Sequence, residues 1–178
     1  MSKGGSLPRT FRLDADIIKG LEEEARRQGA TVNGLTCRIL RKYVKVSAKL
    51  EHFGVITLTK SNMVDLINNL DDKIVSSIAS KIGAGTSKEL MLQLYGSASI
   101  RSFKQFLELV VCGYMDWAFY TEEEKDSELE IRIGHNMGQK WSTFLRNYIE
   151  AALFEITHKK ADFKYVSNYS LIFHIPMK

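Results

Sequence analysis

Cysteine is scarce in this sequence of 178 residues, which contains only Cys37 and Cys112. This scarcity excludes a disulfide framework and the paired thiol motifs of zinc and redox sites. Each cysteine lies within a pattern of helical spacing, so we interpret both as packed core thiols.

Long apolar runs are also missing. The run from Leu107 to Cys112 contains a charge and is far shorter than the ~20 residues that cross a bilayer. The N-terminus lacks the apolar segment of a signal peptide. We therefore expect a cytoplasmic protein with no membrane partner.

Signatures of catalysis are absent from the sequence as well. It has no nucleophile and base at motif spacing, no Walker loop and no constellation of carboxylates. Histidine occurs only as His52, His135, His158 and His174, without the close pairs that hold a metal ion. We therefore expect a protein that is not an enzyme and that uses no cofactor and no metal.

Basic charge is concentrated at one end of the chain. Residues 1–50 hold eleven Lys or Arg against five Asp or Glu, a net charge of +6, whereas the remaining residues hold fourteen against sixteen, a net charge of −2. A basic region of this kind can neutralise phosphates and release their counterions. The uneven distribution is compatible with a nucleic-acid partner for the N-terminal part.

The first fifty residues have the pattern of one short strand and two helices. After a Gly/Ser-rich arm over residues 1–7, residues 9–13 alternate in polarity. Asp14 or Asp16 can cap a helix that ends at Gly29, and Thr31 can cap a second helix. The apolar positions that recur at helical spacing are Ile17, Ile18, Leu21 and Ala25 in the first helix, and Leu35, Ile39, Leu40, Tyr43 and Val44 in the second.

These elements are too few to bury a core in a single chain. If two copies pair residues 9–13 antiparallel, the strands gain their hydrogen bonds and four helices share one core. Folding and dimerisation would then be one event. We expect a dimer core built from Phe11, Leu13, Leu21, Leu35, Ile39 and Leu40.

The segment over residues 8–46 resembles the ribbon-helix-helix DNA-binding proteins of the Arc and MetJ type. The resemblance rests on Arg-Thr-Phe-Arg-Leu-Asp at residues 9–14, an amphipathic helix, Gly29, Ala-Thr-Val-Asn-Gly-Leu at residues 30–35, and a final helix that ends in Arg-Lys-Tyr-Val. In that family the paired strands enter the major groove and their outward side chains contact base edges.

The resemblance implies specific DNA contacts. Thr10 and Arg12 would face the bases, and Arg12 has the fork that matches guanine O6 and N7. Thr31, Val32 and Asn33, at the start of the second helix, would bind phosphate. Pro8 stands where family members often carry a hydrogen-bonding side chain, so a shorter contact strip is expected. The alternative is that Thr10 and Arg12 are simply the solvated side of a strand.

After a connection over residues 47–54, residues 55–178 predict an α+β domain with a small, mainly antiparallel sheet. Residues 55–59, 129–133, 163–166 and 170–175 are predicted strands, the last two forming a hairpin that turns near Asn168. The first predicted helix is capped by Ser61 or Asn62 and ends at Leu70, and further helices are predicted over 71–82, 87–95, 100–120 and 139–157. Thr121 to Asp126 is predicted to be a loop. No family motif is present here, and the size fits a regulatory or oligomerisation domain.

Aromatic residues offer a candidate ligand site in this second domain. Phe103, Phe106, Tyr114, Trp117, Phe119 and Trp141 could line an apolar pocket, with plain core packing as the alternative. His135 lies between Gly134 and Gly138 near a helix start, where we interpret it as a turn histidine and keep a ligand contact as the alternative. The candidate ligand residues are His135, Trp117 and Trp141.

The sequence thus predicts a homodimeric transcriptional regulator, with a tetramer as an alternative, that binds double-stranded DNA and senses a small-molecule effector through its C-terminal domain. One alternative keeps the DNA-binding domain and assigns the protein to plasmid partition or to an antitoxin role. Another makes the N-terminal domain only a dimerisation module for a ligand-binding or catalytic C-terminal domain. Salt-dependent, sequence-selective DNA binding would distinguish this last alternative.

Overall fold

The computed structural model describes residues 7–125 and 128–176. The predicted arm over residues 1–7 therefore lies almost wholly outside the described residues. The chain forms two units, with the boundary between Val44 and Lys45. Among the helices of the described residues, none is long and apolar enough to span a membrane.

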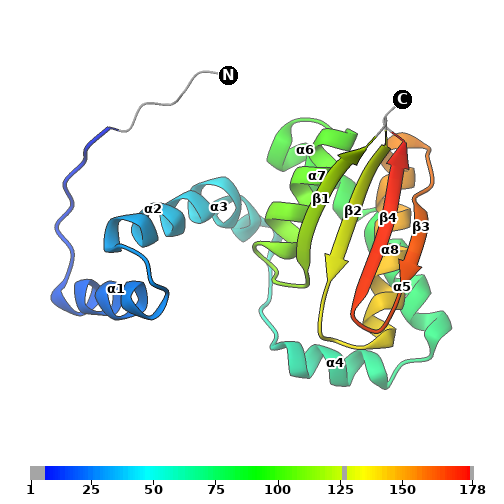
Figure 1. Ribbon diagram of the computed structural model, residues 1–178, viewed down its shortest axis with the longest axis horizontal. Helices are drawn as coiled ribbons and strands as arrows, with labels where there is room; N and C mark the ends of the chain where they lie inside the picture. The colour runs from blue at the N-terminus through cyan, green and yellow to red at the C-terminus, as the bar shows by residue number, and fades with distance from the viewer. Residues whose placement is uncertain (1–6, 126–127, 177–178) are drawn as a thin grey trace. The chain divides into compact units, whose positions relative to one another are not determined.

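The first unit contains two helices, α1 (Ala15–Arg27) and α2 (Val32–Lys42) (Figure 1). Asp14 is the N-cap residue of α1, although its side chain makes no capping hydrogen bond. After α1 the backbone N–H of Ala30 donates to the Ala25 carbonyl at 2.9 Å, and Gly29 takes the left-handed conformation with φ 60°. This Schellman turn is the helix end that Gly29 predicts.

Residues 7–14 form neither helix nor strand in the single chain. A strand needs a neighbour for its hydrogen bonds, and the described part of this unit offers none. Among residues 7–125 and 128–176, the strands all lie in the second unit. The predicted ribbon-helix-helix arrangement requires a second copy and remains a prediction.

The predicted connection over residues 47–54 is mostly helical instead. A π-helical turn (Tyr43–Ser47) is followed by α3 (Ala48–Leu50) and a 3-10 turn (Glu51–Phe53). The difference has a packing cause, because Val46 and Leu50 are buried in the core of the second unit. Gly54, with φ 65°, ends these turns.

The second unit has most of its predicted helices. They are α4 (Lys60–Asn68), α5 (Asp72–Ala84), α6 (Thr86–Tyr95), α7 (Ile100–Gln105), which runs into a π-helical segment (Phe106–Cys112), and α8 (Gln139–Thr157). The helix predicted over 100–120 ends early, because the N–H groups of Tyr114 and Met115 both donate to the Val110 carbonyl and the chain then turns.

A four-stranded antiparallel sheet completes this unit. Its strands are β1 (Phe119–Lys125), β2 (Glu128–Gly134), β3 (Asp162–Val166) and β4 (Ser170–Pro176), in the order β1-β2-β4-β3. Figure 1 shows α8 behind the sheet, where the alternating buried side chains of β2 and β4 point. The predicted α+β class and the β3–β4 hairpin are confirmed.

One strand prediction and one loop prediction were wrong. Residues 55–59 form no strand and keep Ile56 80% exposed, because no strand lies beside them in the single chain. The predicted loop over residues 121–126 is β1 as far as Lys125, and Asp126 lies outside the described residues. Here Lys104 pairs with Glu122 at 2.9 Å and with Glu124 at 3.4 Å, which offsets the repulsion within an acidic edge strand.

Helices α5 and α8 approach each other closely at Gly83. A Cβ added to Gly83 would overlap the Tyr148 carbonyl oxygen and lie 3.2 Å from the Cβ of Ala151. The helix predicted over 71–82 therefore continues through Gly83, where two helix backbones meet. The helix ends one residue later, at Ala84, and Gly85 follows as its C-cap.

We predict that Gly83→Ala destabilises the second unit by about 1–3 kcal/mol, because the added methyl group pushes α5 away from α8. Urea denaturation followed by circular dichroism measures the change. Gly134→Ala is the control, since a Cβ at that position meets no atom within 4 Å. Equal stability of the two variants would contradict the proposed helix contact.

Candidate functional site

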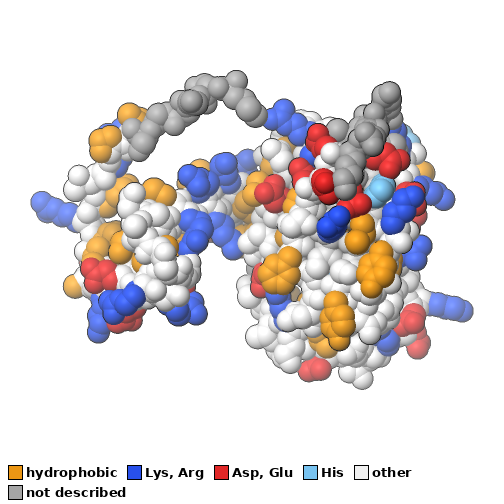
Figure 2. Space-filling model, in the orientation of Figure 1, with side chains coloured by type: hydrophobic (Ala, Val, Ile, Leu, Met, Phe, Trp, Pro, Cys, Tyr) orange, Lys and Arg blue, Asp and Glu red, His pale blue; other side chains and the backbone are white. Residues whose placement is uncertain are grey.

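The first unit leaves most of its apolar stripe exposed. Phe11 is 66% exposed and Val44 is also 66% exposed. Figure 2 shows hydrophobic side chains on the surface of this unit, with Lys and Arg side chains nearby. The exposed large apolar side chains of the described residues in this unit are Leu7, Phe11, Leu13, Ile17, Ile18, Ile39, Leu40, Tyr43 and Val44.

Few side chains are buried within one copy of this unit. Among its described residues, Ala25 and Leu35 are the buried ones, and Leu21 is half-buried. Of the predicted dimer core, only Leu35 and Leu21 are covered by the chain itself, whereas Phe11, Leu13, Ile39 and Leu40 face solvent. Single exposed apolar side chains are ordinary, but a group of this size on a small unit is typical of an interaction surface.

The predicted base-contacting residues lie in the segment before α1. Thr10 and Arg12 are exposed, as are their neighbours Phe11 and Leu13. With no strand in the single chain, the predicted division between a DNA face and a protein face is not tested. Arg12 and Thr10 nevertheless remain accessible to a partner.

The predicted phosphate-binding residues come together at the start of α2. Thr31 is the N-cap residue, and its hydroxyl accepts a hydrogen bond from the Gly34 N–H at 3.1 Å. The N–H groups of Val32 and Asn33 lie in the first turn, where a helix leaves its donors without partners in the helix. This end of α2 can therefore donate hydrogen bonds to an anion.

A polar cluster ties the end of α1 to α2. Arg27 donates to the Glu24 carboxylate at 2.8 and 2.7 Å, Gln28 donates to Glu24, and Arg38 of α2 donates to Gln28. The hydrogen bond from Arg27 lowers the pKa of Glu24. These bonds link the two helices through their exposed faces and complement the small buried contact at Ala25 and Leu35.

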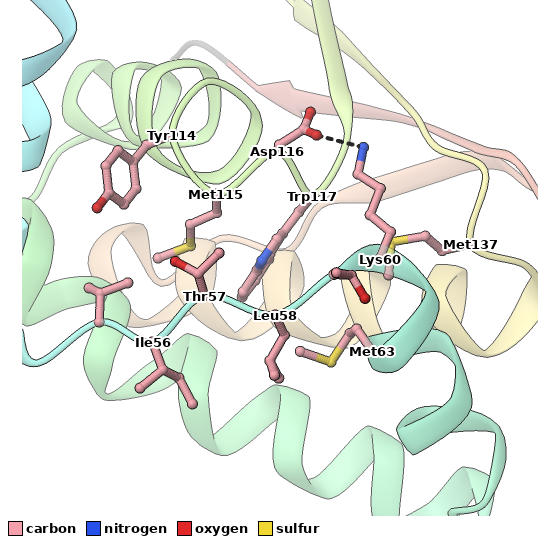
Figure 3. A pocket seen from close by; sticks show the side chains of 12 residues that line it. Ile56, Thr57, Leu58, Lys60, Met63, Tyr114, Met115, Asp116, Trp117 and Met137 are labelled. Carbon is pink, nitrogen blue, oxygen red and sulfur yellow. Dashed lines mark ion pairs between the residues drawn. The ribbon is translucent and has the colours of Figure 1, made fainter.

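The second unit contains an apolar pocket of about 460 Å³ (Figure 3). Residues 55–59 form one wall, and α4 and the turn after the π-helical segment form the others. Trp117 lies at the centre of the pocket. Behind it, the Trp117 ring contacts the rings of Trp141, Phe144 and Tyr148 edge-on, with distances of 5.5, 5.7 and 5.6 Å between ring centroids. The pocket also holds Met63, Tyr114, Met115 and Met137.

One ion pair lies at this pocket. The Lys60 ammonium is 2.9 Å from the Asp116 carboxylate, as the dashed line in Figure 3 marks. Lys60 is the first residue of α4, and Asp116 has an unusual positive φ of 54°. Neither residue was predicted from the sequence, because Lys60 and Asp116 are far apart in the chain and meet only in the folded unit.

Of the candidate ligand residues, only Trp117 lines this pocket. Trp141 is fully buried, and its indole N–H donates to the Trp117 carbonyl at 3.2 Å. Among the other predicted pocket aromatics, Tyr114 lines the pocket, Phe103 and Phe106 are fully buried, and Phe119 is exposed. Core packing, the alternative interpretation, therefore accounts for Trp141, Phe103 and Phe106.

His135 is the satisfied turn histidine that the sequence favours. Its Nδ1 accepts from the Met137 N–H at 3.3 Å, so its Nε2 carries the proton and donates to the Ser142 hydroxyl at 2.8 Å. The side chain is buried, and burial lowers its pKa. Gly138, with φ 81°, completes the turn into α8.

The histidines do not converge on a metal site. No group of metal-ligating side chains occurs among residues 7–125 and 128–176. His174 instead lies on the sheet between Glu128, at 2.7 Å, and Glu130, at 3.1 Å. The hydrogen bond to Glu128 is the main cause of its raised pKa.

Comparison of the chain with models of known protein families, with curated proteins and with solved structures finds no match. The function is therefore inferred from the residues and their geometry.

We predict that His135→Asn reduces the loss of stability at acidic pH. Unfolding returns His135 to its ordinary pKa of 6.5, so the unfolded chain gains a proton that the folded chain resists. The stability that neutral His135 contributes is full above that value and falls below it, by at most about 1.4 kcal/mol per pH unit.

Thermal denaturation between neutral and mildly acidic pH measures this effect as the difference between wild type and variant. Taking the difference removes the contribution of His174, which is the same in both proteins. The raised pKa of His174 gives a stabilisation that is complete below pH 6.5 and is lost as the pH rises through the pKa of the folded state. His158→Asn, at an exposed position with φ 55°, is the control. An unchanged pH dependence in His135→Asn would refute the prediction.

Proposed function

We propose that this protein is a sequence-specific DNA-binding regulator of transcription that acts as a homodimer through a ribbon-helix-helix domain. The observation that carries the proposal is the exposed apolar stripe of the first unit, which one copy cannot bury. Its exposed members, from Phe11 to Val44, include most of the residues expected in a shared core. The first unit of a second copy can bury these exposed apolar side chains.

Pairing of two copies also solves the problem of the segment before α1. Residues 9–13 of each copy then form an antiparallel ribbon and satisfy one another's backbone groups. Phe11 and Leu13 turn toward the four helices, and Thr10 and Arg12 turn outward. Dimerisation thus orders the segment and divides its side chains between protein and DNA.

The outward side chains suit the major groove. Arg12 can donate two hydrogen bonds to a guanine, and Thr10 can offer its hydroxyl or its methyl group to a base. The start of α2, with the capped turn at Thr31, holds a backbone phosphate and so fixes the ribbon in register. The net charge of +6 over residues 1–50 adds attraction to the duplex.

The alternative roles differ in what the protein does with DNA. A partition or antitoxin protein would share the ribbon and its contacts, so genomic neighbours rather than binding would distinguish it. A protein that uses the first unit only as a dimerisation clamp would lack sequence-selective binding. Selection of bound sequences from a random DNA pool, followed by titration at several salt concentrations, tests the proposal.

We predict that Arg12→Ala weakens binding to the selected sequence by ~1–3 kcal/mol and relaxes the preference at one base of each half-site. Binding to random DNA falls less, because there the variant loses only one positive charge and no specific base contact. Fluorescence anisotropy of labelled duplexes measures both affinities. Arg101→Ala removes the same side chain from α7 in the second unit and serves as the control; equal effects of the two changes would refute the assignment.

We predict that Leu35→Asp abolishes folding and dimerisation of the first unit. Leu35 is only 3% exposed, and a carboxylate at this position would be buried without a partner. Analytical ultracentrifugation should show loss of the dimer. Glu22→Lys, which reverses a charge at an exposed position of α1, should remain dimeric; a folded monomer of Leu35→Asp would contradict the shared core.

A further inference from the structure

We infer that the pocket around Trp117 binds a small, planar aromatic carboxylate. The inference concerns the second unit alone and stands apart from the DNA-binding proposal. Its test uses no DNA, so the two proposals can fail separately.

The size and lining of the pocket fit a small organic molecule. Its volume of about 460 Å³ lies within the range of ligand sites, and its surface is mostly apolar. Trp117 and Tyr114 supply aromatic faces and edges for a ring. The side chain of Trp117 is held in place by the rings behind it, so it offers a prepared surface.

Methionine side chains surround this aromatic surface. Met63 comes from α4, Met115 from the turn before Trp117, and Met137 from the turn before α8. Methionine is flexible and its sulfur makes favourable contacts with aromatic rings. Three methionine side chains around one tryptophan favour a flat aromatic ligand over a branched aliphatic ligand.

The wall formed by residues 55–59 can move to let such a ligand enter the pocket. This segment carries neither helix nor strand, so its movement breaks no strand pairing. Ile56 and Leu58 on this segment line the pocket and are 80% and 44% exposed, so the wall carries apolar surface that a ligand can cover.

Charge at the pocket favours an anion. Lys60 and Asp116 are the charged residues that line it, and the Lys60 side chain is the less exposed, at 38% against 67%. An ammonium group has three donors, so Lys60 can bind a ligand carboxylate while it keeps Asp116. Lys60 also begins α4, so the positive end of the helix dipole adds to the attraction.

The test is titration of the full chain with 1-naphthoate, monitored by calorimetry and by the methyl NMR signals of methionine. We expect saturable binding below about 1 mM, with shifts at Met63, Met115 and Met137 and none at the fully buried Met91. The cationic analogue 1-naphthylmethylammonium should bind at least about tenfold more weakly.

Lys60→Met should weaken naphthoate binding about tenfold and strengthen binding of the cationic analogue, because the Asp116 carboxylate then lacks its lysine partner and can pair with the ligand ammonium. Lys88→Met is the matched control, because Lys88 is similarly exposed and paired, with Glu155 at 2.7 Å, but lies outside the pocket. Leu58→Asp, at a half-exposed position on the wall, should abolish naphthoate binding without loss of the fold.

Two results would overturn the inference. One is the absence of saturable naphthoate binding to wild type. The other is binding that shifts Met91 as much as the pocket methionines, or that is insensitive to both Lys60→Met and Leu58→Asp.

Discussion

The first unit is governed by a shortage of buried apolar surface. Ordering a residue costs about 1–2 kcal/mol of backbone entropy, which two short helices and an unpaired segment must recover by burial. Within one copy that burial centres on Ala25 and Leu35, while the rest of the stripe faces water. Under our proposal, the dimer that binds DNA is also the smallest assembly in which this part of the chain has a core.

The second unit meets the same requirement by itself. Helix α8 lies behind the sheet, and the glycine at position 83 lets α5 and α8 approach more closely than a larger side chain would allow. The core includes Val46 and Leu50, which lie beyond the stripe of α2. The two units thus differ in kind: the second has a complete core in one copy, and the first does not.

The elements that the sequence predicted best are those whose signal is local. The capped start of α2 at Thr31, the left-handed turn at Gly29 and the long amphipathic α8 depend on neighbours in sequence. Predictions that depended on a distant partner fared worse. Residues 55–59 have the composition of a strand but find no neighbour, whereas the acidic β1 finds both a neighbouring strand and Lys104. The pocket was predicted only through Tyr114 and Trp117, because Lys60, Met63 and Asp116 reach it by folding alone.

The order of the sheet leaves β1 and β3 as its edges, and both edges oppose the addition of further strands. β1 carries three consecutive glutamates, Glu122 to Glu124, and the pairing of β3 with β4 is irregular between Phe163 and Tyr165. Negative charge and a bulge are two of the devices by which proteins protect exposed edges from aggregation. In a dimer joined through its first units, two copies of this sheet would belong to one assembly, and such protection keeps them from merging into one continuous sheet.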